Sequence, residues 1–189
     1  GKRLFLDATE AGGIVYGICK KKNDLADLSA FKSRIFIGDV TNKNFINKTF
    51  NFFKKKKIKL HGLVNNAGIR QRIRFEKIKK KEIENVMNVN FFSIFFNLSS
   101  IVGERGFKDL SGYASSKSAL DGLTKSLTIE LAENFKKLRI NNVRPGFTKT
   151  SFYKNFKVNK KKLYKWTISK TPASRWAETE EISKLIIFL

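Results

Sequence analysis

A tyrosine and a lysine in this sequence have a spacing that suits acid–base chemistry. Tyr113 and Lys117 lie four residues apart in a segment with helical periodicity, so both side chains project from one face. A phenol has a pKa of about 10, and a nearby ammonium group stabilises the phenolate and lowers that pKa. Ser100, at the end of the preceding predicted strand, is placed to share a substrate oxygen with the phenol. These three residues predict proton transfer at an oxygen atom.

Polar or glycine-rich clusters follow several predicted strands. They are Gly12-Gly13, Asp39-Val40, Asn65 to Gly68, Ser99-Ser100 and Pro145-Gly146. The carboxyl ends of parallel strands line one crevice, where backbone N–H groups approach a phosphate at a helix N-terminus. Together the clusters predict a cleft for an anionic ligand.

Strands and helices alternate along the chain. The apolar patterns predict strands over Arg3–Asp7, Arg34–Val40, Leu60–Val64, a segment ending near Ser99-Ser100, and Leu138–Val143. Helical spacing appears at Ile14 and Ile18, at Phe45, Thr49, Phe52 and Phe53, over Glu76–Asn90, and over Tyr113–Asn134. This alternation predicts an α/β fold, a doubly wound parallel sheet covered on both faces, in one domain over residues 1–189.

Composition limits the classes of protein. The 189 residues are 41% hydrophobic, which is a globular composition. A single cysteine, Cys19, excludes a disulfide within the chain, and a single histidine, His61, excludes a histidine-rich metal site, so no metal is expected. No apolar stretch matches a membrane span and no signal-peptide pattern opens the chain, so we expect a soluble, cytoplasmic protein without membrane contact.

The net charge of +23 raises the question of nucleic-acid binding. The lysines form short scattered runs where helix ends or loops are expected, and they outnumber arginine, which reads phosphate and guanine better. This distribution favours solvated helix faces over a nucleic-acid site.

Four motifs occur in a familiar order: Asn65-Asn66-Ala67-Gly68, Ser100, Tyr113-x-x-x-Lys117 and Pro145-Gly146. In this order they resemble the short-chain dehydrogenase/reductase family. The resemblance implies a Rossmann-type sheet that binds NAD or NADP and an oxidoreductase that interconverts a carbonyl and an alcohol. It also implies assembly as a homodimer or homotetramer.

The resemblance assigns roles to individual residues. Tyr113 would exchange the proton with the substrate oxygen, and Ser100 would hold that oxygen. Lys117 would lower the Tyr113 pKa and bind the nicotinamide ribose, and Asn90 would support a proton relay. The residues implied in cofactor binding are Gly13, Asp39, Val40, Asn66, Ala67, Gly68, Tyr113, Lys117, Pro145, Gly146, Thr148 and Thr150.

The sequence departs from the family pattern in three places. No register of Leu6 to Ile18 reproduces the phosphate turn Thr-Gly-x-x-x-Gly-x-Gly, and residues 8–33 are too few for a helix, a strand and another helix. The stretch between Asn90 and Ser100 is too short for a helix end, a turn and a strand. We therefore expect an abridged sheet whose second strand, the helix after Asn90 and the last strand are short or missing. Either the family member is itself shortened, or segments are missing from the sequence.

Two stretches favour a substrate class. Residues 171–178 and Asn65–Arg72 resemble gluconate 5-dehydrogenase-like members, which act on sugar acids. The alternative is 3-oxoacyl-[acyl-carrier-protein] reductase, whose acidic carrier suits a basic surface. Arg70, Arg72 and Arg74 are either a solvated loop or contacts for a carboxylate or phosphate. A further alternative, of another class, is a non-catalytic reductase scaffold with a basic nucleic-acid-binding surface.

Overall fold

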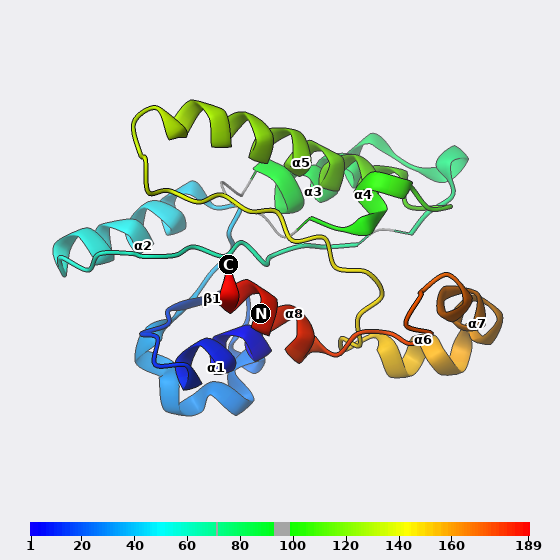
Figure 1. Cartoon of the computed structure of the whole chain (residues 1–189), viewed down its shortest axis with the longest axis horizontal. Helices are drawn as coiled ribbons and strands as arrows, with labels where there is room; N and C mark the ends of the chain where they lie inside the picture. Colours follow the sequence, from blue (N-terminus) through cyan, green and yellow to red (C-terminus); the bar gives the residue numbers. More distant parts are fainter. Residues whose placement is uncertain (71, 93–98) are drawn as a thin grey trace.

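A computed structural model describes residues 1–70, 72–92 and 99–189. Helices α3, α4 and α5 lie on one side of a layer of extended segments, and α1 and α8 lie on the other (Figure 1). The helices are α1 (Lys2–Glu10), η1 (Lys22–Arg34), α2 (Lys43–Lys55), η2 (Phe75–Lys77), α3 (Lys80–Met87), η3 (Asn88–Phe92), α4 (Ile101–Arg105), α5 (Ser111–Ala132), α6 (Tyr153–Asn159), α7 (Lys161–Ser169) and α8 (Thr179–Phe188). No helix in the described part of the chain is long and apolar enough to cross a membrane.

The regular sheet of the described residues is a parallel pair. Strand β1 (Gly17–Cys19) pairs with β2 (Ile35–Ile37) in the register Gly17 to Ile35. One cluster of rings packs against the pair, with centroids 5.0–6.4 Å apart in edge-on or stacked contacts: Tyr16, Phe36, Phe52 and Phe53. The short parallel pair with helices on both sides confirms an abridged α/β fold.

The helices predicted after Val40 and over Tyr113–Asn134 are confirmed as α2 and α5. The region Glu76–Asn90 is helical in three pieces, η2, α3 and η3, and residues 78 and 79 between η2 and α3 are not helical. Polar side chains fix the ends: Asn42 accepts the N–H of Phe45 at 3.1 Å and so caps α2. Local patterns predicted these helices because each has a continuous apolar stripe.

The strand predicted over Arg3–Asp7 is wrong, because these residues lie in α1. Gly12, at a φ of 90°, and Gly13 close the carboxyl end of this helix, and the N–H of Gly13 bonds to the Ala8 carbonyl at 2.9 Å. Glycine with positive φ is the usual signal that a helix has ended. The helix predicted around Ile14 and Ile18 is also wrong, since Ile18 lies in β1.

Two further predicted strands, Leu60–Val64 and Leu138–Val143, form no regular strand in the structure. Leu60, Leu63 and Val64 keep 42–47% of their surface exposed. An apolar segment becomes a regular strand when neighbouring strands pair with it, and none of the described residues does so here. The strand expected to end near Ser99-Ser100 falls largely on residues 93–98, outside the described residues.

Two polar or aromatic clusters hold the outer helices in place. On α1 and α8, Asp7 accepts a hydrogen bond from Ser183 and pairs with Arg3 at 2.5 Å. Beside α6 and α7, Trp176 is 1% exposed and donates to the Thr167 hydroxyl at 2.7 Å. The rings that surround Trp176 are Phe147, Phe152, Tyr153, Phe156 and Tyr164. Packing is therefore the role of Trp176 in this structure.

Candidate active site

Helix α5 carries the predicted tyrosine and lysine on one face. Tyr113 lies in its first turn, and Lys117 follows one turn later with 5% of its surface exposed. The Lys117 Nζ atom lies 5.7 Å from the centre of the Tyr113 ring. The spacing of four residues thus brings the ammonium group over the face of the phenol.

Burial dominates the electrostatics of this pair. It raises the pKa of Tyr113, and the opposing influences are a hydrogen bond with Ser100 and the positive charge of Arg70. Burial also lowers the pKa of Lys117 to about 8. The net shift of the Tyr113 pKa is therefore upward, and Arg70 is a cation that opposes it. That Lys117 lowers this pKa stays a prediction.

Ser100 lies at the start of α4, where it is 8% exposed. Its hydroxyl accepts the Val102 N–H at 3.2 Å and also reaches the Tyr113 phenol. The next N–H, of Ile101, donates to the Pro145 carbonyl at 3.3 Å. Ser100, Tyr113 and the Pro145 loop are therefore neighbours.

Asn90 is completely buried in the π-helical turn η3, a kind of turn often found at functional sites. Its Oδ1 accepts the Ile69 N–H at 2.7 Å, and its Nδ2 donates to the Ile69 carbonyl at 2.9 Å. Nδ2 also donates to the Ser116 hydroxyl at 3.1 Å. The amide of Asn90 thus fixes the loop that follows Gly68 against α5.

Two observations around this loop fit a dinucleotide. A Cβ on Gly68 would lie 3.4 Å from Asn90 Oδ1 and 3.8 Å from Lys117 Nζ, so the glycine leaves open the space that these atoms border. The Asn65 Nδ2 atom is buried without a hydrogen-bond partner among the described residues. Gly1 also lies against this loop, since a Cβ on it would come within 2.9 Å of the Asn66 side chain.

Other predicted cofactor residues lie in structural turns. Asp39, just after β2 and before Val40, pairs with Lys20 at 2.6 Å and accepts the Thr41 N–H at 2.9 Å. These contacts hold the Asp39 pKa at about 2. Thr148 donates to the Gly146 carbonyl at 3.2 Å, and the Thr150 N–H donates to the Thr148 carbonyl at 2.9 Å.

Gly13 is separated from the group around Tyr113. Gly13 lies at the carboxyl end of α1, whereas the contact with Asn66 is at the amino end. The nine residues of the helix separate the two ends by about 14 Å, at 1.5 Å per residue. No hydrogen bond or ion pair within residues 1–70, 72–92 and 99–189 ties Gly13 to the group. Sequence reasoning missed the ion pair of Lys20 with Asp39, for which the three lysines that follow Cys19 were the signal.

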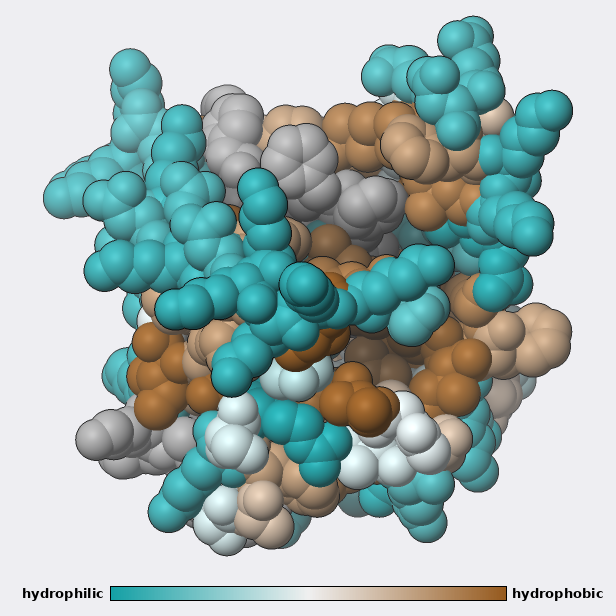
Figure 2. Space-filling view, turned by 90° about the vertical axis from the view of Figure 1, so that its left-hand side faces the viewer, coloured by the Kyte–Doolittle hydropathy of each residue, from teal (hydrophilic) through white to brown (hydrophobic). Residues whose placement is uncertain are grey.

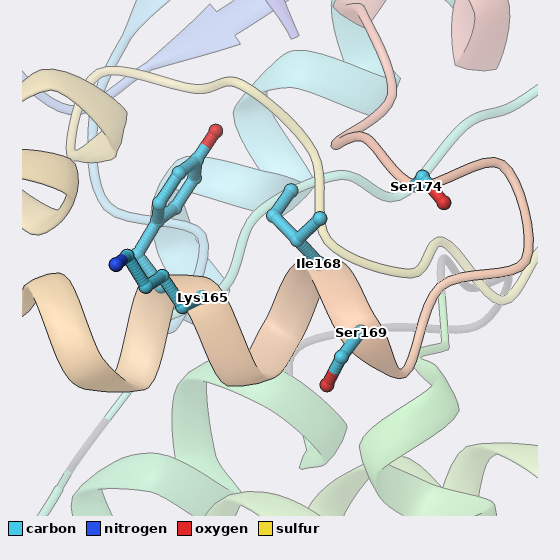
Figure 3. Close-up of a pocket in the computed structure, with 5 residues that line it drawn as sticks. Lys165, Ile168, Ser169 and Ser174 are labelled. Atoms are coloured by element: carbon cyan, nitrogen blue, oxygen red, sulfur yellow. The ribbon is translucent and has the colours of Figure 1, made fainter.

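Two shallow hollows lie away from Tyr113. One, of about 360 Å³, lies between α7 and the turn at Ser174 (Figure 3). Ile168 and Ser169 point to opposite sides of α7 there. The other, of about 600 Å³, runs along α3 beside Glu82 and Asn85. Neither hollow contains a residue of the group around Tyr113.

Helices on both sides of a parallel pair of strands, with a half-buried tyrosine and a buried lysine beside the loop that ends in Gly68, are typical of a Rossmann-type oxidoreductase. The family model described as "short chain dehydrogenase" matches residues 18–161. The chain therefore belongs to the short-chain dehydrogenase/reductase family and is an enzyme of that class.

Relatives and solved structures agree with this assignment. The 3-oxoacyl-[acyl-carrier-protein] reductase FabG of Buchnera aphidicola subsp. Schizaphis graminum is 30% identical over 210 residues, covering 100% of this chain and 84% of the relative. The 5-keto-D-gluconate 5-reductase of Escherichia coli K12 is 29% identical over 169 residues, covering 80% of this chain and 65% of the relative. The structure described as "ElxO with NADP Bound" superposes with a TM-score of 0.88 at 26% identity, covering 100% of this chain and 86% of that one.

Proposed function

We propose that this chain interconverts a ketone and a secondary alcohol on a small sugar acid or polyol, with NAD or NADP as cofactor. The relatives support both parts, since one is a ketogluconate reductase and a solved neighbour is described with NADP bound. The proposed catalytic residues are Asn90, Ser100, Tyr113 and Lys117, in a single domain over residues 1–189.

The observation that carries the sugar-acid proposal is the position of Arg70. Its guanidinium lies 4.4 Å from the centre of the Phe152 ring, and its charge acts on the Tyr113 phenol. No carboxylate among the described residues lies within ion-pair distance of Arg70, and its side chain is exposed. An arginine in this position supplies two parallel N–H donors for a substrate carboxylate.

The chain's own residues then perform the proton chemistry. Ser100 donates to the substrate oxygen, and Tyr113 gives a proton to that oxygen in reduction or removes it in oxidation. The Tyr113 pKa is raised, so the phenol carries its proton at neutral pH. Lys117 and Asn90 border the space at Gly68, where they would hold the nicotinamide ribose and pass a proton. A nicotinamide nucleotide supplies or accepts the hydride when it is bound.

For the cofactor, charge near β1 favours NADP over NAD. An acidic side chain beside the adenosine ribose selects NAD, whereas a cation accommodates the 2′-phosphate of NADP. Strand β1 ends at Cys19 and is followed by Lys20 to Lys22, and the nearby carboxylate of Asp39 is neutralised by Lys20 at 2.6 Å.

A second candidate substrate is a 3-oxoacyl group on acyl carrier protein, because the FabG relative aligns with the whole chain. The atoms around the reacting carbonyl of a 3-oxoacyl thioester carry no charge, so that substrate leaves Arg70 without a partner. Arg70 therefore separates the two candidates.

The test is a kinetic comparison of two substrates with NADPH, 5-keto-D-gluconate and an acetoacetyl thioester. We expect turnover of the ketogluconate, and Arg70→Gln should raise its KM by roughly 10- to 100-fold, the loss of a charged hydrogen bond. Arg74→Gln, in the same loop, is the matched control and Tyr113→Phe is the inactive reference. Turnover of the thioester alone, unchanged in Arg70→Gln, would identify the second candidate instead.

A further inference from the structure

Ser116 is a fully buried polar residue for which the proposed reaction has no use. Its hydroxyl donates to the Tyr113 carbonyl at 2.8 Å and accepts a hydrogen bond from Asn90 Nδ2 at 3.1 Å. A serine hydroxyl has one donor and two acceptor positions, so it makes both contacts at once. Ser116 thereby joins Asn90 to the helix turn that carries Tyr113.

Asn90 extends this connection to the opposite side of the site. Both the N–H and the carbonyl of Ile69 bond to its amide, at 2.7 and 2.9 Å. Ile69 lies between Gly68 and Arg70. The polar chain Ile69–Asn90–Ser116–Tyr113 therefore spans three separate segments, the loop, η3 and α5.

We propose that Ser116 is a positioning residue, which holds the Asn90 amide so that the Arg70 loop and the Tyr113 turn keep a fixed spacing. The proposal rests on the proposed function, in which Arg70 and Tyr113 contact opposite ends of one substrate. Without the hydroxyl, one N–H of the Asn90 amide faces a dry environment with no acceptor. The loop then shifts to satisfy that N–H, and small shifts of reacting groups are costly in rate.

The test uses Ser116→Ala, with Ser118→Ala as the matched control. Ser118 lies on the same helix and its hydroxyl also donates to a backbone carbonyl, that of Gly103, without touching Asn90. Ser116→Thr restores a hydroxyl that a helix allows to bond one turn back. Thermal unfolding checks that each variant folds, and Ser116→Cys replaces Ser116→Ala if the alanine variant does not.

Hydrogen exchange at the Ile69 amide is the first measurement, because it requires no activity. We expect faster exchange in Ser116→Ala and wild-type exchange in Ser118→Ala. The second measurement is kinetics: kcat should fall roughly tenfold in Ser116→Ala with the NADPH Kd unchanged, and Ser116→Thr should recover most of it. In an Asn90→Ala background, Ser116→Ala should cost nothing more, since both act through one contact.

Unchanged exchange at Ile69 in Ser116→Ala would overturn the proposal. So would faster exchange with a kcat equal to that of Ser118→Ala, because the contact would then have no effect on the reaction. A folded wild-type chain that turns over neither substrate refutes the proposed function and the kinetic role together. Exchange at Ile69 still decides in that case whether Ser116 holds Asn90.

Discussion

At the scale of single residues, burial gives Tyr113 and Lys117 their chemical character. The Tyr113 pKa is raised above its ordinary value of 10.0 and the Lys117 pKa is lowered from 10.5 to about 8, so the two groups are further apart in proton affinity than in water. Burial disfavours the charged form of each group, the phenolate of Tyr113 and the ammonium of Lys117. Tyr113 therefore holds its proton at neutral pH, and Lys117 is the group of the pair that titrates near pH 8.

The lowered pKa of Lys117 predicts a pH dependence. In the reduction direction, kcat/KM for the cofactor should be constant at low pH and fall as the pH rises through about 8, because the free enzyme then loses the ammonium charge. Steady-state rates at saturating ketone check this. Lys117→Met should be slow at every pH and lack this limb. A limb near pH 8 in Lys117→Met would assign the titration to another group.

The same pKa shift predicts that the contribution of Lys117 to stability rises with pH, whereas kcat/KM falls. The Lys117 pKa is about 8 in the folded chain, below the ordinary value of 10.5, so the unfolded chain binds the proton more tightly. The contribution of Lys117 to stability therefore rises as the pH increases from about 8 to 10.5. Urea unfolding of the wild type and Lys117→Met across this interval measures the difference without any assay of activity.

At the scale of elements, the contact between α4 and α5 decides where Lys117 lies. A Cβ on Gly103 would come within 2.9 Å of the Lys117 carbonyl carbon and the Ser118 nitrogen. These are backbone atoms, which cannot turn aside as a flexible side chain does. Only glycine lets α4 approach α5 this closely.

Gly103→Ala should therefore destabilise the fold by about 1–3 kcal/mol, the usual cost of overpacking. Gly122→Ala is the matched control on α5, since a Cβ there meets nothing within 4 Å. In the middle of an exposed helix this change should stabilise by about 0.5–1 kcal/mol. Denaturant unfolding of both variants measures the change in the free energy of unfolding, which should fall in Gly103→Ala and rise in Gly122→Ala. Equal effects would show that α4 and α5 do not pack as the structure has them.

Sequence patterns predicted some of these elements and missed others for physical reasons. Helices α2 and α5 have their apolar stripes and ends encoded locally. Arg3–Asp7 has an apolar run that fits a strand or a helix, and the deciding signal was the glycine pair after Glu10. Leu60–Val64 has the composition of a strand, but a strand depends on neighbours that no local pattern reveals.

In the candidate site, too, some residues were predictable from local patterns and others were not. Tyr113 and Lys117 were predictable because one helical turn places them. Ser100 was predicted at the end of a strand, and the structure has it at the start of α4. The pairing of Asn90 with Ile69 and Ser116 joins residues 21 and 26 positions apart, so only the folded chain shows it. Phe152 beside Arg70 is likewise a contact between distant segments.

At the scale of the whole molecule, positive charge covers much of the surface. Figure 2 looks onto the end of the molecule that carries α2, where hydrophilic side chains extend over exposed apolar groups. The net charge of +23 attracts any anion, whereas Lys20 and Lys21, directly after β1, would act at one place. Salt weakens the attraction from the net charge and the attraction from the lysines after β1 alike. A substitution of those lysines removes mainly the local attraction, so the two experiments together separate the two contributions.

This reasoning predicts how the affinity for the cofactor responds to salt. NADPH should bind more tightly than NADH, and raising the salt from about 0.1 M to about 1 M, which shortens the Debye length from about 10 Å to about 3 Å, should weaken NADPH more. Nicotinamide fluorescence titrations measure both Kd values. The double variant Lys20→Gln/Lys21→Gln should remove most of the preference for NADPH.

The control is Lys54→Gln/Lys55→Gln at the end of α2, which removes the same charge elsewhere on the surface. It should lower the affinity for both nucleotides only slightly and leave most of the preference for NADPH, because only the general field changes. A preference for NADPH that survives in Lys20→Gln/Lys21→Gln, or disappears equally in the control, contradicts selection at β1. The 2′-phosphate would then be sensing the molecule's overall charge, and the lysines after β1 would be part of the same solvated surface as those on α2.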